Sequence, residues 1–188
     1  MNVIDLAVAT HRILDEAGLR HAFGGALALN LYSDPRMTSD VDVSVFVPWE
    51  QRADVLPLFE EIGFRVEPTA GPPVPVAGIR LRSEKHREYL DVFFALDPVY
   101  DEVRDRAVMV SYGRNGEQLP FLTAEDIVMF KLSFNRAKDW VDIQNVIQGG
   151  PALDTGYIER VLVEMRGPTM YPRVARLQAM IAAGGELR

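Results

Sequence analysis

The sequence predicts an α+β protein, with a mixed sheet and flanking helices over residues 1–122 and an all-helical lobe over residues 123–188. Two observations predict this division. Valines alternate with other residues over residues 40–47, and an apolar run fills residues 88–96, as is typical of strands. After Thr123 the apolar spacing becomes helical, and no strand signal follows. We expect one compact two-lobed unit with a functional site in the cleft between the lobes.

The elements of the first lobe follow from apolar spacing and from its glycine and proline breaks. A helix is predicted from a possible Asn2 cap to Gly18, and a Gly24-Gly25 turn separates a short strand from the next helix. Residues 68–78 hold four prolines and two glycines and predict a loop. The expected helices are 3–17, 26–31, 48–62 and 98–106, and the expected strands are 21–23, 40–47, 79–82, 88–96, 108–112 and 118–122.

Thr123 opens the second lobe as a predicted helix cap, because Glu125 and Asp126 place acids in the first turn. The expected helices there are 124–135, 138–148, 155–166 and 171–183.

Composition excludes several classes of function. The chain has no cysteine, which excludes disulfides, thiolate metal sites and a cysteine nucleophile. Only three histidines are present, so a zinc site built from histidines would need nearly all of them. A formal charge of -7 excludes a uniformly basic nucleic-acid binder. With no apolar run long enough for a bilayer and no signal-peptide pattern, we expect a cytoplasmic protein without a membrane partner.

Two carboxylates on one strand are the most informative feature. Asp40 and Asp42 lie two residues apart, so they point to the same face of the strand, about 7 Å apart. Such neighbouring anions repel one another unless a cation lies between them, and Mg²⁺ prefers oxygen ligands of this kind. Asp91 adds a third acid inside an apolar strand.

The Gly24-Gly25 turn stands shortly before these acids. Glycines between a strand and a helix let a phosphate approach the backbone, and the helix N-terminus offers N–H donors. A glycine pair alone is usually only a turn, so its value lies in this proximity.

Together these residues carry a resemblance. Gly24-Gly25, a spacer of 14 residues, Asp40-x-Asp42 and a later Asp91 look like the nucleotidyltransferase superfamily typified by DNA polymerase β. The chain further resembles the AbiEii/MenT-type nucleotidyltransferase toxins over roughly residues 20–148. The supporting segments are Phe23-Gly24-Gly25-Ala26-Leu27, Arg36-x-Thr38-Ser39-Asp40, Glu125-Asp126-Ile127-x-x-x-Lys131 and Arg136-x-Lys138-Asp139-x-x-Asp142.

The resemblance implies the nucleotidyltransferase fold and transfer of a nucleoside monophosphate from an NTP to a hydroxyl, with Mg²⁺ and release of pyrophosphate. It implies that Asp40 and Asp42 hold the metals. Asp91 would contact one metal and take or orient the proton of the acceptor. The remaining expected nucleotide contacts of the first lobe are Gly24, Gly25, Ser39 and Arg36.

The resemblance also implies a lysine on the triphosphate, with an acid behind it, from the helical lobe. We expect Lys131 as an exposed lysine, and either Asp139 or Asp142 as the acid. Lys131 and Asp142 are 11 residues apart and share a face if one helix runs through. Asn135-Arg136 could break that helix.

The leading hypothesis is a toxin that modifies tRNA 3′ ends and is held by a cognate antitoxin; the RNA acceptor comes from resemblance only. One alternative is a nucleotidyltransferase acting on a small, aminoglycoside-like molecule, which the acidic net charge favours. Another is an antitoxin-like module that nucleotidylates a partner protein.

Overall fold

The computed structural model describes residues 2–68 and 78–185. The chain divides into two compact units. One comprises Met1–Leu27 with Met37–Leu122, and the other comprises Ala28–Arg36 with Thr123–Arg188. The segment Ala28–Arg36 therefore groups with the helical unit, although it lies within the range 1–122 predicted for the first lobe.

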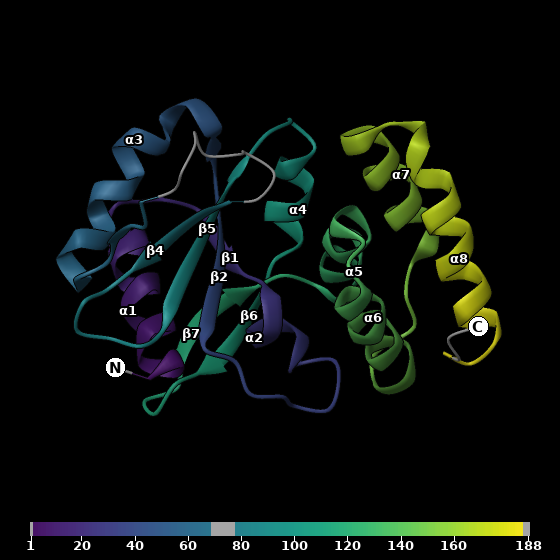
Figure 1. Ribbon diagram of the computed structural model, residues 1–188, viewed down its shortest axis with the longest axis horizontal. Helices are drawn as coiled ribbons and strands as arrows, with labels where there is room; N and C mark the ends of the chain where they lie inside the picture. The colour runs from purple at the N-terminus through teal and green to yellow at the C-terminus, as the bar shows by residue number, and fades with distance from the viewer. Residues whose placement is uncertain (1, 69–77, 186–188) are drawn as a thin grey trace. The chain divides into compact units, whose positions relative to one another are not determined.

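A seven-stranded mixed sheet forms the first unit, in the order β3-β4-β5-β2-β1-β7-β6 (Figure 1). The central pair, β2 with β5, is parallel, while β4 runs antiparallel to β5 and β1 antiparallel to β2. The strands are β1 His21–Phe23, β2 Asp40–Pro48, β3 Arg65–Val66, β4 Ile79–Arg82, β5 Tyr89–Ala95, β6 Val108–Tyr112 and β7 Glu117–Phe121. The strands predicted from the sequence all form, and the two-residue β3 is an addition at the sheet edge.

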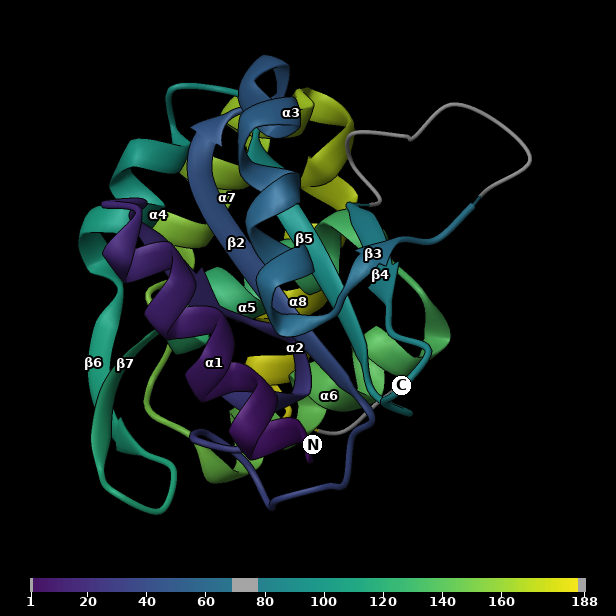
Figure 2. The ribbon, with the colours of Figure 1, turned by 90° about the vertical axis from the view of Figure 1, so that its left-hand side faces the viewer.

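Alternation along the central strands separates a buried face from a polar one. Val41, Val43 and Val45 of β2 are completely buried. The helix α1 (Val3–Glu16) and the helical segment containing α3 (Arg52–Val55) lie over one face of the sheet, and α1 packs on both β2 and the end of that segment (Figure 2). Asp40, Asp42 and Asp91 occupy the alternate positions, so they belong to the opposite face.

The predicted helix 48–62 is wrong as a continuous helix. The segment instead forms a 3₁₀ turn Trp49–Gln51, the short α3, and a 3₁₀ stretch Leu56–Ile62 that ends at Gly63. Pro57 explains the break, because it has no N–H to donate and its ring clashes with the carbonyl four residues earlier. This unit also contains α1, α4 (Tyr100–Arg106) and the start of α2 (Gly25–Leu29). Most of the predicted loop 68–78 lies outside the described residues.

The second unit is helical, as predicted. Its elements are the end of α2 (Gly25–Leu29), α5 Ala124–Phe134, α6 Ala137–Gly149, α7 Thr155–Arg166, a 3₁₀ turn Pro168–Met170 and α8 Tyr171–Ala182. α5 packs against both α6 and α7, and α7 packs against α8. Within the described ranges, no helix has the length and apolarity needed to cross a bilayer.

Candidate active site

Strand register brings the carboxylates of the sheet together. Asp42 on β2 lies directly beside Asp91 on β5, and Asp40 lies beside Tyr89 two pairs earlier. Neighbouring residues in register point to the same face, so Asp40, Asp42 and Asp91 share one surface of the sheet. The grouping predicted from Asp40-x-Asp42 and a separate apolar strand is thus present in the backbone.

The glycine pair is adapted to Asp42. Gly25 has a φ of 54°, and a Cβ atom there would lie 1.8 Å from the Asp42 Oδ2 atom. No other residue fits this position without displacing the carboxylate. The Gly24 N–H donates to the Asp42 carbonyl at 2.9 Å, so it continues the sheet hydrogen bonding at the start of the turn.

Short polar side chains hold the start of β2. The Ser39 hydroxyl donates to the Asp40 carboxylate at 3.0 Å. Thr38 uses one hydroxyl oxygen twice, since it accepts from the Asp40 N–H and donates to the Asp40 carbonyl, each at 3.2 Å. These bonds restrict the backbone and side chain of Asp40. Ser39, which is predicted as a nucleotide contact, hydrogen-bonds to a carboxylate in this structure.

Arg80 on β4 is the residue that sequence reasoning missed at this site. Its Nε donates to Asp91 Oδ1 at 2.8 Å and its Nη2 to Asp91 Oδ2 at 2.6 Å. The same Nη2 lies 3.6 Å from Asp40 Oδ2. The hydrogen bond to Asp91 is the largest cause of a raised Arg80 pKa. Arg80 stands opposite Asp91 in the β4–β5 register, which only the strand order reveals.

The donor set suits a hard cation. Carboxylate oxygens are the ligands that Mg²⁺ takes, and it is commonly bound by one or two carboxylates together with substrate phosphates. In the described part of the chain, no three acidic or histidine side chains converge as a ready-made metal cluster. The positive charge next to Asp40 and Asp91 is instead the Arg80 guanidinium. Asp40 and Asp42, with Asp91 beside them, are the residues that could hold a metal.

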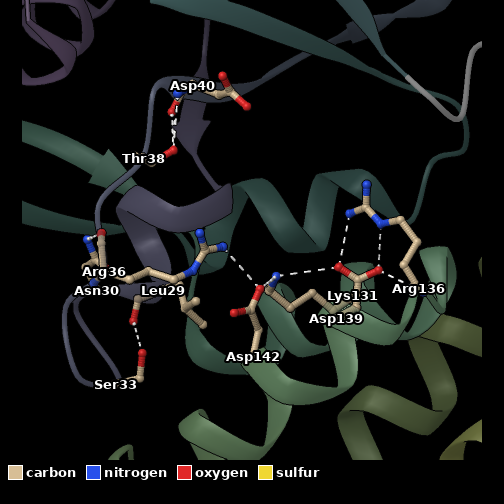
Figure 3. Close-up of polar contacts among 10 residues, drawn as sticks. All are labelled: Leu29, Asn30, Ser33, Arg36, Thr38, Asp40, Lys131, Arg136, Asp139 and Asp142. Atoms are coloured by element: carbon tan, nitrogen blue, oxygen red, sulfur yellow. Dashed lines mark hydrogen bonds and ion pairs between the residues drawn. The ribbon is translucent and has the colours of Figure 1, made fainter.

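The helical unit contains a separate charge network (Figure 3). The Lys131 Nζ atom lies 2.5 Å from Asp142 Oδ2 and 3.7 Å from Asp139 Oδ1. Arg36 approaches the same Asp142 oxygen at 3.3 Å. The expectation of an exposed Lys131 is wrong, because its side chain is only 11% exposed and is paired with buried acids.

The two candidate acids differ in their partners. Asp139 is fully buried and accepts from the Arg136 side chain and backbone N–H. Burial acts to raise the pKa of Asp139, but the bonds from Arg136 outweigh it, and the net effect lowers that pKa. Asp142 holds both Lys131 and Arg36, so it is the acid more directly behind the predicted lysine.

A single helix does not run from Lys131 to Asp142. Asn135 adopts a left-handed conformation, with a φ of 58°, and ends α5, after which α6 begins. Lys131 and Asp142 meet because α5 packs on α6, and not because they share a helical face.

Hydrogen bonds to the backbone of Arg36 and an ion pair to its side chain hold this residue in place. Asn30 accepts from the Arg36 N–H and donates to the Arg36 carbonyl, both at 3.0 Å. Asp142 holds the guanidinium end, and the side chain remains 46% exposed. Arg36 can therefore present a fixed cation to an anionic ligand (Figure 3).

The sequence model of the family described as "Nucleotidyl transferase AbiEii toxin, Type IV TA system" matches residues 10–177. None of the curated proteins matches the chain.

Several solved structures share the fold. ANT(2")-Ia in complex with adenylyl-2"-tobramycin is 18% identical with a TM-score of 0.55, over 94% of this chain and 97% of that one. The lincosamide antibiotic adenylyltransferase LnuA, lincomycin-bound, is 16% identical with a TM-score of 0.54, over 78% and 98%. An antigenic nucleotidyltransferase-like protein from Paracoccidioides brasiliensis is 20% identical with a TM-score of 0.53, over 91% of each chain. The fold class predicted from the sequence is confirmed.

Proposed function

This chain belongs to the AbiEii family of nucleotidyltransferases, and from that premise we propose that it transfers a nucleoside monophosphate from an NTP to the 3′ end of tRNA. The observation that carries the proposal is the register of β2 with β5, which sets Asp42 beside Asp91 next to the glycine turn. The RNA acceptor and the role as a toxin rest on the family. A cognate antitoxin is part of the same proposal.

The proposed reaction forms one bond and breaks one. The acceptor hydroxyl oxygen bonds to the α-phosphorus of the NTP, the bond from that phosphorus to the bridging oxygen breaks, and pyrophosphate leaves. Asp91 takes or orients the hydroxyl proton. Asp40 and Asp42 hold Mg²⁺, which when bound supplies positive charge against the phosphate oxygens. Ser39 and Thr38 keep Asp40 in place for this task.

Other residues are proposed as triphosphate contacts. Arg36 carries a half-exposed guanidinium that Asn30 and Asp142 orient. Lys131 is proposed as the lysine that contacts the triphosphate, and Asp142 as the acid that holds Lys131 in place. For Gly25, the proposal is a close backbone approach of phosphate, since no side chain fits there.

A small-molecule acceptor is the second candidate. Two of the structures that share the fold are described as acting on, or binding, antibiotics. The net charge of -7 also suits a cationic acceptor better than RNA. The fold alone does not choose between these acceptors.

The test is a labelling experiment with each α-labelled NTP, Mg²⁺, and separate pools of tRNA, total protein and aminoglycosides. Label in the tRNA pool supports the leading proposal, and label in the drug pool replaces it with the second candidate. Asp42→Asn tests the metal assignment, because it keeps the shape of the side chain and removes its charge. We expect it to transfer at least 100-fold more slowly while melting at or above the wild-type temperature. Full transfer by Asp42→Asn would refute the metal assignment.

A further inference from the structure

We propose that Arg80 is a positioning residue of the transfer site, where it holds the Asp91 carboxylate in one orientation and moderates the binding of divalent cations. This inference rests on the proposed function. Arg80 touches neither the acceptor nor the NTP in the proposal; it acts through Asp91 and Asp40. The residue stands outside every motif by which the sequence resembles its family.

The Arg80 guanidinium is fixed as well as close. Two parallel N–H donors of Arg80 meet the two oxygens of Asp91, at 2.8 and 2.6 Å. The guanidinium carbon also lies 4.8 Å from the centre of the Tyr89 ring, so the ring supports the group from a neighbouring position on β5. A bidentate pair of this kind sets the plane of the carboxylate. Each Asp91 oxygen retains a further lone pair for a proton or a cation.

Arg80 also changes the charge of the polar face. Asp40, Asp42 and Asp91 bring three negative charges to neighbouring positions of β2 and β5. The guanidinium neutralises part of that charge, since its Nη2 reaches both Asp91 and Asp40. A fixed cation next to carboxylates weakens their attraction for a second cation. Arg80 is therefore expected to lower the affinity for a divalent metal while keeping Asp91 aligned.

These two effects predict that removing Arg80 strengthens metal binding but slows transfer. Arg80→Ala leaves the carboxylates with more uncompensated charge, so Mn²⁺ should bind about fivefold more tightly or more. The same variant frees Asp91 to rotate, so kcat should fall at least about tenfold while the KM for NTP stays within about twofold. A purely structural role for Arg80 predicts weaker metal binding together with slower transfer.

Arg80→Lys separates charge from orientation. A lysine ammonium restores the positive charge but lacks the planar fork that engages both oxygens of Asp91. Its Mn²⁺ affinity should return to within about twofold of wild type, while kcat remains low. Arg82→Ala is the matched control, because Arg82 is exposed on the same strand and the same face, two positions from Arg80. It should leave Mn²⁺ affinity and NTP turnover unchanged.

The experiment measures Mn²⁺ binding to the full chain by electron paramagnetic resonance, alongside steady-state transfer with the labelled pool that accepts nucleotide. Wild-type kcat in Arg80→Ala, or Mn²⁺ affinity that is unchanged or weaker in that variant, would overturn the inference. If the wild-type chain neither binds Mn²⁺ nor transfers nucleotide, the proposed function itself fails. A wild-type chain that does both, with Arg80→Ala indistinguishable from it, overturns only the role of Arg80.

Discussion

Replacing Lys131 by methionine tests whether the charge network of the helical unit stabilises the protein. The Lys131 side chain is 11% exposed and the Asp142 side chain 7% exposed, with 2.5 Å between Nζ and Oδ2. Breaking a buried ion pair from one side typically lowers the free energy of unfolding by about 3–5 kcal/mol. Arg36 remains 3.3 Å from the same Asp142 oxygen, so the stranded carboxylate keeps one cation. We therefore expect the lower end, about 3 kcal/mol.

Urea unfolding followed by circular dichroism measures this loss for Lys131→Met, Asp142→Leu and the double variant. For a chain of this length, about 3 kcal/mol corresponds to roughly 6–12 °C in melting temperature. The double variant should be less destabilised than the sum of the single variants, with a coupling of about 1–3 kcal/mol, because the two residues contact each other. Single variants that unfold within about 0.5 kcal/mol of wild type would refute the buried-pair reasoning.

The proposed contact of Lys131 with triphosphate needs its own measurement. A charge-assisted contact of about 1.5–3 kcal/mol predicts that Lys131→Ala weakens NTP binding by about 10- to 150-fold. Asp142→Asn is the control, since it disturbs the same network and keeps the lysine. Calorimetric titration with a non-hydrolysable NTP, at a temperature where all chains are folded, compares them. Equal dissociation constants for wild type and Lys131→Ala would remove Lys131 from the nucleotide site and leave its structural role intact.

Two further predictions concern the first unit. Gly25→Ala should abolish transfer and lower the melting temperature more than Gly18→Ala does. Both glycines have a positive φ, but only at Gly25 would the new Cβ atom meet Asp42. Equal losses of melting temperature in the two variants would contradict this reasoning. His21 is buried, and that burial lowers its pKa to about 4, so the unfolded chain binds more protons than the folded one between about pH 6.5 and 4. The free energy of unfolding should therefore fall by up to about 3 kcal/mol as pH drops through that window. His21→Gln should flatten this slope in urea unfolding at pH 7, 5.5 and 4, and an unchanged slope would assign the pH dependence to other groups.

The geometry around His21 supports the sign of that pH dependence. Its Nδ1 lies 2.8 Å from the Leu19 carbonyl and so carries the proton of the neutral ring. The Nε2 atom then accepts from His11 Nδ1 at 2.9 Å. Protonating His21 would place an N–H at Nε2 facing the N–H at His11 Nδ1, and this repulsion disfavours the charged form of His21 in the folded chain.

Local chemistry in the sequence determined most elements of the fold. The Asn2 side chain caps α1 by accepting from the Asp5 N–H, and the Thr123 hydroxyl caps α5 by accepting from the Asp126 N–H. The alternation along residues 40–47 placed the valines in the core and Asp40 and Asp42 on the other face. Such signals are readable because they depend on residues within one or two turns, or on the period of a single strand. The break at Pro57 has an equally local cause, although the apolar spacing of residues 48–62 predicts one continuous helix.

Tertiary structure alone decided which residues of separate elements meet. The strand order sets β4 beside β5, and only this brings Arg80 onto Asp91. The packing of α5 on α6 brings the buried Lys131 to Asp142 across the break at Asn135. No local pattern encodes these pairs, because side-chain periodicity states which face a residue occupies and not which element covers that face. The partner is selected by the packing of the whole unit.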